Sequence, residues 1–481
     1  MIIQKAKYQP SAVTMYQNNP LIEALTDYLE WSPAAILEKL SKEPSEINEL
    51  ANRVQSTAWL SSLPSNLFIP TKRHFALFET IDLLIRQGYM LRNPMTPTRA
   101  EYLRDAYARQ QAGEKLTECT FEEDVEEQLT ASLIGTSGMG KTRTVKRILT
   151  LYPRLIQHDR ETMGGPILQI TYIHVECPHD GSVITLCKDI LTQIDNLTGL
   201  NYKTKFRITD RTTLDTLKST LVHILAVHYV GIIVIDEIQN LASSRKNRED
   251  LFNFIVSLSN SLNVPLLFVG TPKIHKFLTG NMRTARRFGT RGFINWKPLS
   301  PETSEWKKLI RGLWKCNRLK HDAEEVPKEI EEKLYEHSFG IVELLLKLFI
   351  LAQTRVLLVS ACKDRPTEQK LTPEAIDYIF NEYFQNVKPI LDKLHKGDVE
   401  ALLKLDDIVM PESIDEVISE IKADLYEDVD SELDPAALRK ADVEDSIRSG
   451  MEYAGDALPD VAKDIAQSLI NHETPMKGED D

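Results

Sequence analysis

The chain has 481 residues, which is room for two or three domains, and 42% of them are hydrophobic, as in an ordinary globular protein with a sizeable core. No run of about 18 apolar residues appears and the first residues lack a signal-peptide pattern, so we expect a cytoplasmic protein with no membrane partner. The net charge of −13 argues against nucleic acid only if it is read as an average. Residues 391–481 hold 26 acidic and 9 basic side chains, whereas residues 1–390 hold 49 basic and 45 acidic ones, so the main body is free to meet DNA.

Helical patterns dominate the beginning of the chain and predict an N-terminal helical module with a linker over residues 1–99. The patterns cover "NPLIEALTDYLEW" from Asn19 and the long apolar stretch that ends in "GYMLRNP". Arg92 and Asn93 of that last segment precede the motif described next, and they are candidate contacts for the adenine of a nucleotide. A helix end packed on the core is the alternative interpretation.

Five apolar runs, rich in β-branched residues, alternate with helical patterns and predict an α/β core with five parallel strands over residues 100–303. The expected strands are 128–136, 168–176, 231–237, 264–271 and 292–299. The expected helices between them are 142–152, 181–197, 213–229 and 248–262.

A phosphate-binding motif follows the first expected strand. The residues "GTSGMGKT" match G-x-x-x-x-G-K-[ST], in which glycines let backbone N–H groups surround phosphates at a helix N-terminus. Lys141 reaches the outer phosphates, and the Thr142 hydroxyl is a ligand for Mg²⁺. We therefore predict that a nucleotide, ATP or GTP, binds here with Mg²⁺; a glycine turn that binds nothing is the alternative. The predicted nucleotide contacts are Gly135, Thr136, Ser137, Gly138, Met139, Gly140, Lys141, Thr142 and Arg143.

Two adjacent carboxylates end the third expected strand, in "IIVIDEIQNL". Asp236 is placed to bind Mg²⁺ directly or through water, and Glu237 to orient and polarise an attacking water. The alternative interpretation is that this pair only caps the N-terminus of the following helix. The pair is typical of NTPases in which a further strand lies between those carrying the two motifs, and 168–176 fits that place. Thr271, after the fourth strand, is a candidate sensor of the γ-phosphate or an ordinary strand-end threonine.

Two basic segments in the core are candidates for contacts with the DNA backbone, because phosphate contacts without base readout need only lysines and arginines on a loop. Solvated surface charge is the alternative for each of them. The candidates are Lys203, Lys205, Arg207 and Arg211 in "NYKTKFRITDR", and Arg245 and Lys246 in "SSRKNRED".

After residue 303 the strand patterns stop. Residues 304–387 predict an all-helical lid, and residues 388–481 an acidic C-terminal tail with little core of its own.

The motifs occur in the order of the AAA+ fold: the phosphate loop, "VIDE", a polar strand end, an arginine cluster and a helical lid. More specifically, residues 1–390 resemble the TnsC family, the ATPase regulators of Tn-seven-like transposons, including CRISPR-associated ones. The resemblance rests on "NNPLIEAL", "IRQGYMLRNP", "IGTSGMGKT", "VIDEIQNL", "VGTPK", "RTARRFG" and "LLKLFILAQ".

The resemblance implies a catalytic set of Lys141, Asp236, Glu237 and Thr271, completed by an arginine finger from Arg283, Arg286 or Arg287 of a neighbouring subunit. A basic solvated loop is the alternative for these arginines. It implies a homo-oligomer, a hexameric ring or a helical filament, on double-stranded DNA. It also implies that the protein connects a target-selection protein to the transposase, and that ATP hydrolysis controls disassembly. The acidic tail is suited to a basic surface of the transposase.

One departure from the family pattern concerns hydrolysis: Gly340 is followed by no second sensor arginine, so we expect either slow hydrolysis or another residue in that role. Two other functions share this core. One is an initiator or clamp-loader-like ATPase of replication or repair, and the other is a scaffold on DNA that binds nucleotide without hydrolysing it.

Overall fold

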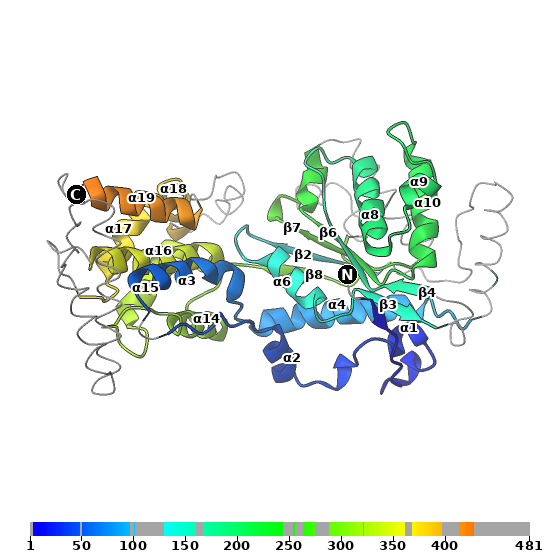
Figure 1. Cartoon of the computed structure of the whole chain (residues 1–481), viewed down its shortest axis with the longest axis horizontal. Coiled ribbons are helices and arrows are strands. Elements are labelled where there is room, and N and C mark those ends of the chain that lie inside the picture. The colour runs from blue at the N-terminus through cyan, green and yellow to red at the C-terminus, as the bar shows by residue number, and fades with distance from the viewer. Residues whose placement is uncertain are drawn as a thin grey trace, which may run out of the picture. The chain divides into compact units, whose positions relative to one another are not determined.

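The computed structural model describes residues 3–48, 51–96, 101, 129–159, 167–243, 254, 263–274, 288–320, 322–360, 368–396 and 413–427. They form two compact units (Figure 1). Residues up to 41 and from 70 to 298 make the first unit. Residues 42–69, 299–396 and 413–427 make the second.

A five-stranded sheet forms the centre of the first unit, and all its strand pairs are parallel. Three of its strands are buried along their whole length, which explains why they read as continuous apolar runs in the sequence. In spatial order the strands are β5 (Tyr172–Glu176), β6 (Ile232–Asp236), β7 (Leu266–Gly270), β2 (Thr130–Gly135) and β8 (Phe293–Trp296). The predicted five-stranded parallel core is thus confirmed.

The strand between β2 and β6 is β7, and this corrects the expectation that 168–176 lies there. Residues 168–176 instead contribute to two strands, β4 (Ile167–Ile170) and β5. The chain changes sheets at Thr171, whose hydroxyl donates to the Pro153 carbonyl at 2.7 Å. The strand β4 pairs with β3 (Leu155–His158), which pairs in turn with β1 (Gln4–Lys5), in a small second sheet.

Helices cover the large sheet on both faces (Figure 1). On one face α8 (Val183–Thr198) and α10 (Leu214–Val227) bury their apolar stripes against β5, β6 and β7. On the other face α4 (Lys72–Met90) approaches so closely that a Cβ on Gly88 would lie 2.5 Å from the Pro265 ring. The other helices of this unit are η1 (Thr14–Tyr16), α1 (Pro20–Glu23), η2 (Tyr28–Glu30), α2 (Pro33–Leu40), α6 (Lys141–Leu149), α9 (Tyr202–Lys205), η3 (Ile238–Ser243) and η4 (Pro272–Ile274).

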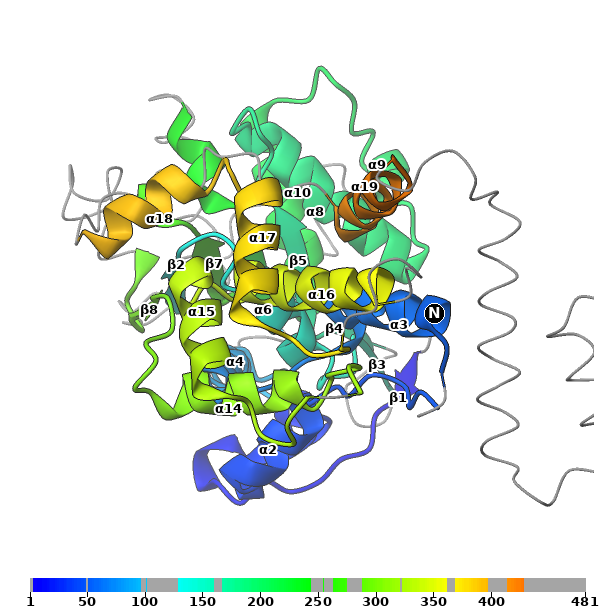
Figure 2. The ribbon, with the colours of Figure 1, turned by 90° about the vertical axis from the view of Figure 1, so that its left-hand side faces the viewer.

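The second unit is helical throughout its described residues, as predicted for a lid. Its centre is α16 (Val342–Val359), which is buried on almost every side, and Figure 2 shows α15 (Lys328–Ser338) and α17 (Pro373–Tyr383) beside it. The helices are α3 (Arg53–Asn66), α14 (Ser304–Trp314), α15 (Lys328–Ser338), α16 (Val342–Val359), α17 (Pro373–Tyr383), α18 (Lys388–His395) and α19 (Ile414–Glu427).

The unit takes in helices from outside the expected lid range of 304–387. The helix α3 comes from the expected N-terminal module, and α18 and α19 from the expected tail. Apolar residues at helical spacing explain the difference, since Val417 and Ile421 of α19 are buried where this helix packs on α16. None of the described helices combines the length and the apolar character that crossing a bilayer requires.

Candidate functional site

The phosphate loop lies between the end of β2 and the start of α6, as its sequence predicts. Gly138 and Gly140 have φ values of 76° and 77°, a backbone conformation that favours glycine. At Gly135 an added Cβ would lie 2.5 Å from the Trp296 carbonyl oxygen, so the close pairing of β2 with β8 also requires glycine. Both glycines that the motif specifies, Gly135 and Gly140, therefore have a local structural reason, and so does Gly138 between them.

Lys141 begins α6 and its side chain is buried within the loop. Its Nζ donates hydrogen bonds to the carbonyl oxygens of Gly135 (2.8 Å) and Thr136 (2.9 Å). The ammonium group and the first N–H groups of α6 thus share one end of the helix, where the helix dipole also favours negative charge. This arrangement suits a bound phosphate.

Asp236 ends β6 and lies beside the phosphate loop. Its carboxylate accepts hydrogen bonds from the Thr142 hydroxyl and the Glu237 N–H, and His174 Nε2 lies 3.3 Å from its Oδ2. Burial alone would raise the pKa of Asp236, but the hydrogen bonds from His174, Thr142 and Glu237 outweigh it and hold the pKa below its ordinary value. A charged carboxylate next to a hydroxyl is a donor set that fits Mg²⁺.

Glu237 follows at once, and its backbone turns sharply with φ of 54°. The carboxylate is exposed and accepts a hydrogen bond from Gln239 Nε2. Gln239 Oε1 accepts in turn from the Thr271 N–H at 3.1 Å. One amide side chain therefore joins the residue after β6 to the residue after β7.

Thr271 is buried, and its hydroxyl has no hydrogen-bond partner among the described residues. Its strand, β7, lies between the strands that carry the phosphate loop and Asp236. The carboxyl ends of parallel strands meet at one edge of a sheet, so Thr271 is placed between the two motifs. A buried hydroxyl with no partner in the described part of the chain fits a ligand oxygen at this position.

His174 and Gln239 belong to this site but were not predicted from the sequence. His174 lies on β5, the strand next to β6, and its ring reaches Asp236 only through the pairing of these strands. Gln239 stands two residues after Glu237, in the same motif, and this proximity is the signal that could have pointed to it.

The structure does not bring Arg92 and Asn93 to the phosphate loop. The Arg92 guanidinium is buried and donates to the carbonyl oxygens of Gly88, Val230 and Gly231, at the end of β6 opposite Asp236. The Asn93 amide donates to the Asn18 carbonyl. The alternative interpretation, a helix end packed on the core, describes these two residues.

The remaining predicted residues fall into three groups. Arg143 lies in the first turn of α6, half-buried, and burial followed by repulsion from Arg147 lowers its pKa. The four basic candidates for DNA contacts in this part of the core lie on α9 or in the connection to α10. Two of them, Lys203 and Lys205, contact different groups. Lys203 Nζ donates to the Thr192 hydroxyl, whereas Lys205 Nζ lies 5.4 Å from the centre of the Tyr202 ring. Arg207 and Arg211 are exposed. Arg245, Lys246, Arg283, Arg286 and Arg287 lie outside the described residues.

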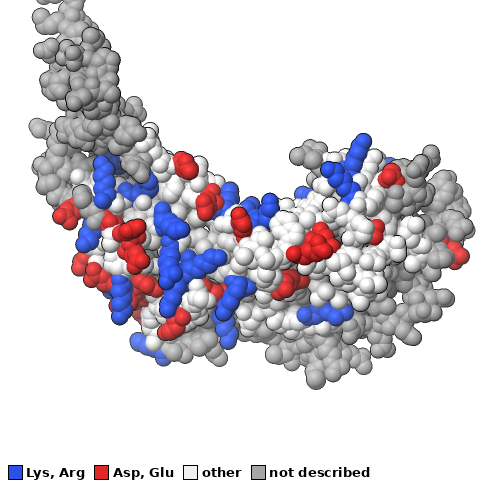
Figure 3. Space-filling view, turned by 90° about the horizontal axis from the view of Figure 1, so that it is seen from below, with Lys and Arg blue, Asp and Glu red and all other residues white. Residues whose placement is uncertain are grey.

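A further basic group, not singled out from the sequence, lies on and just after α14. Figure 3 shows Lys and Arg side chains gathered on the face seen from below, with acidic side chains between them. The exposed basic residues of this segment are Lys307, Lys308, Arg311 and Lys315.

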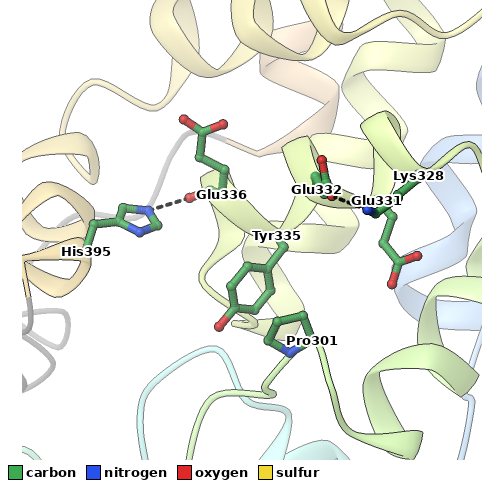
Figure 4. Close-up of a pocket in the computed structure, with 7 residues that line it drawn as sticks. All are labelled: Pro301, Lys328, Glu331, Glu332, Tyr335, Glu336 and His395. Carbon is green, nitrogen blue, oxygen red and sulfur yellow. Dashed lines mark hydrogen bonds and ion pairs between the residues drawn. The ribbon is translucent and has the colours of Figure 1, made fainter.

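In the second unit, the turn before α16 lacks a second sensor arginine. Gly340 has φ of 70°, and the first turn of α16 carries Glu343, which pairs with Lys347 at 3.2 Å. A cavity of about 430 Å³ lies elsewhere in this unit, and none of the predicted site residues lines it (Figure 4). Its wall includes the His395 ring, bonded to the Glu336 carbonyl at 2.8 Å. The lining residues are Pro301, Lys328, Glu331, Glu332, Tyr335, Glu336 and His395.

Comparison with known proteins supports the class of fold. A family model described as "AAA domain" matches residues 125–278, which include the phosphate loop, Asp236, Glu237 and Thr271. No curated protein matches the chain. The strand order, the phosphate loop and the matched domain together define an AAA+ P-loop fold.

Several solved structures are similar to this chain at low identity. The ORC1 protein of Aeropyrum pernix in complex with DNA is 16% identical, with 78% of this chain and 93% of that chain covered and a TM-score of 0.35. Cdc6p from Pyrobaculum aerophilum is 14% identical, with coverages of 70% and 98% and a TM-score of 0.34. AMPPCP-bound DnaA from Aquifex aeolicus is 11% identical, with coverages of 68% and 94% and a TM-score of 0.29. Similarities as weak as these do not indicate what this chain binds.

Proposed function

We propose that this protein is a Mg²⁺-dependent ATPase that assembles on double-stranded DNA and regulates transposition, connecting a target-selection protein to the transposase. The observation that supports hydrolysis most strongly is the contact between the Thr142 hydroxyl and the Asp236 carboxylate, with Glu237 next in the chain. The transposition role is supported by the sequence resemblance over residues 1–390.

In this proposal the protein binds and orients the phosphates of ATP. Backbone N–H groups of the loop and Lys141 hold the outer phosphates, and the Thr271 hydroxyl, which has no partner within the described residues, contacts the γ-phosphate. Thr142 and Asp236 would hold Mg²⁺, which supplies charge neutralisation at the phosphates when bound. Water attacks the γ-phosphorus, its proton passes to Glu237, and the bond to the β-phosphate oxygen breaks to release ADP and phosphate.

Assembly and DNA binding are the finer parts of the proposal. An arginine finger from Arg283, Arg286 or Arg287 of a neighbouring copy would complete the site, and head-to-tail contacts of this kind give a ring or, where they do not close, a helical filament. Lys205, Arg207 and Arg211 are suited to DNA phosphates by their exposure and charge. The basic residues on and after α14 form a second candidate DNA contact.

Electron microscopy of the protein with duplex DNA and a non-hydrolysable ATP analogue tests the assembly. Regular filaments or stacked rings that require both DNA and nucleotide are expected, and monomers under these conditions would contradict the proposal. The Glu237→Gln variant should form assemblies that persist with ATP, because hydrolysis is proposed to drive disassembly. An unchanged lifetime would contradict that mechanism.

The same preparation of protein, duplex DNA and nucleotide also tests the two alternative functions. Assemblies that form without measurable hydrolysis would identify a nucleotide-dependent scaffold. Loading of a second ring-shaped protein onto DNA, with no effect on transposase recruitment, would identify an initiator or clamp-loader-like ATPase. Deletion of 428–481, which leaves α19 in place, separates the tail's proposed role, since retained transposase recruitment would remove that role alone.

A further inference from the structure

The amide of Gln239 lies between two groups of the candidate site and bonds to both. Nε2 donates to the Glu237 carboxylate, and Oε1 accepts from the Thr271 N–H at 3.1 Å. The opposite orientation of the amide would set its oxygen against the carboxylate and its NH₂ against the Thr271 N–H. The two partners therefore fix the orientation of the amide between them.

Packing holds this amide against the backbone of β7. A Cβ added to Gly270 would lie 2.8 Å from Gln239 Oε1 and 2.6 Å from Ile238 Cγ2. The last residue of β7 is thus a position where the Gln239 and Ile238 side chains leave room for nothing larger than glycine. The amide therefore lies directly against the backbone at the end of β7.

Glu237 needs such a partner because little else orients its carboxylate. The side chain is exposed, and Gln239 supplies its hydrogen bond within the part of the chain that the structure describes. A carboxylate that takes a proton from an attacking water must be held within hydrogen-bond reach of it. Solvent exposure alone would leave the side chain free to rotate.

We propose that Gln239 is a positioning residue, which holds the Glu237 carboxylate toward the attacking water and links it to the backbone that presents the Thr271 hydroxyl. This inference rests on the proposed ATPase function. It adds to that function a direct connection between the residue that contacts the γ-phosphate and the residue that takes the proton. A shift of Thr271 on contact with the γ-phosphate then moves the amide, and with it Glu237.

Gln239→Leu removes both hydrogen bonds at nearly constant size. We expect kcat to fall by about 10- to 100-fold, the scale of a misplaced catalytic group, while the Kd for ATP changes less than about twofold. A purely structural role predicts a different result, namely parallel losses of ATP affinity, kcat and thermal stability. Isothermal titration, steady-state kinetics and thermal unfolding of the full chain separate the two.

Gln239→Glu adds a readout that packing does not move. A protonated Glu at 239 donates to Glu237 and accepts from the Thr271 N–H as Gln does, whereas an ionised one repels Glu237. The kcat deficit of Gln239→Glu relative to wild type should therefore shrink as pH falls, while the deficit of Gln239→Leu stays constant. Asp236 and Lys273 are the other charged residues on the described elements packed here, β6, β7, η3 and η4.

Asn240→Ala is the matched control, because this neighbouring amide donates to the Cys177 carbonyl at 3.0 Å rather than to Glu237. It should retain wild-type kcat. A kcat of Gln239→Leu within about twofold of wild type, or a Gln239→Glu deficit that does not change with pH, would overturn the inference. If Gln239→Leu does not fold, the pH dependence of Gln239→Glu decides alone. A wild-type protein that hydrolyses no ATP would instead overturn the proposed function.

Discussion

The Thr142 hydroxyl donates a hydrogen bond to the Asp236 carboxylate, and this contact joins the first turn of α6 to the end of β6. Thr142 lies in the helix that follows β2 and Asp236 ends β6, and these two strands flank β7, so the sheet order is what brings the two residues together. Because the hydrogen bonds to Asp236 keep its pKa below the ordinary value, the carboxylate is charged at neutral pH. The phosphate loop and the acidic strand end therefore form one oxygen-lined site.

Lys141→Ala should weaken ATP binding by about 10- to 100-fold, because it removes a charge-assisted hydrogen bond worth about 1.5–3 kcal/mol. Isothermal titration with ATP measures the change. Lys146→Ala is the control, since Lys146 lies in the same helix with its side chain 54% exposed, and its Nζ lies 3.6 Å from the Glu176 carboxylate. Equal losses in the two variants would show that general charge, rather than the position of Lys141, determines affinity.

Thr271→Val should reduce kcat by about tenfold or more while leaving stability unchanged or higher, because the buried hydroxyl has no partner within the described chain. Thr354→Val of α16 is the matched control, as its hydroxyl is also buried and without a partner there. Urea unfolding and steady-state kinetics of both variants make the comparison. A marked loss of stability in Thr271→Val alone would indicate that the hydroxyl has a structural role.

Asp82→Ala should destabilise the first unit by about 3–5 kcal/mol, because it leaves the Arg86 guanidinium buried without its main counter-charge. Arg86 Nε lies 2.8 Å from Asp82 Oδ2, and both side chains are almost fully buried. The Tyr152 hydroxyl also donates a hydrogen bond to Asp82 at 2.8 Å. The free energy of unfolding in urea measures the loss. Glu332→Ala, which breaks the exposed pair with Lys328, should change it by less than about 1 kcal/mol.

The second unit should lose stability in acid through Asp377. Burial would raise the pKa of this carboxyl, but hydrogen bonds from His337 and Lys333 lower it below its ordinary value of 3.8. A lowered pKa in the folded state means that the contribution is complete above the unfolded value and is lost as pH falls through the folded one. Urea midpoints should therefore fall more steeply below about pH 5 for wild type than for Asp377→Asn. Parallel curves would contradict this assignment.

The five strands of the core could be predicted because buried parallel strands are continuous apolar runs. The order of the strands could not be predicted, because an apolar run does not indicate which strands it pairs with. For that reason residues 168–176 were expected at the position that β7 occupies in the sheet. The strands β1 and β3 are short and partly polar, so they carry no such signal. The helix α19 was assigned to the tail because its segment has many charged residues and only a short apolar stripe.

Some residues of the candidate site could likewise be predicted from the sequence, and others could not. The phosphate loop and Asp236 follow from local spacing, and the structure places them together. His174 acts through a contact between two strands, which a linear pattern does not contain. Gln239 follows Glu237 closely in the sequence, but its contact with the Thr271 N–H depends on the fold. Arg92 precedes the loop in sequence, yet its guanidinium is held by carbonyl oxygens at the opposite end of β6. Position along the chain was a poor guide where a side chain is fixed by distant backbone.

The central claim is that Asp236, Thr142 and Glu237 form a site that hydrolyses ATP. The measurement that tests it most directly is the steady-state ATPase rate of wild type and Glu237→Gln with Mg²⁺ and duplex DNA at saturating ATP. The account predicts hydrolysis by wild type and a loss of about 100-fold or more in the variant, which should still bind ATP. Equal rates in the two proteins, or no hydrolysis by wild type, would contradict it.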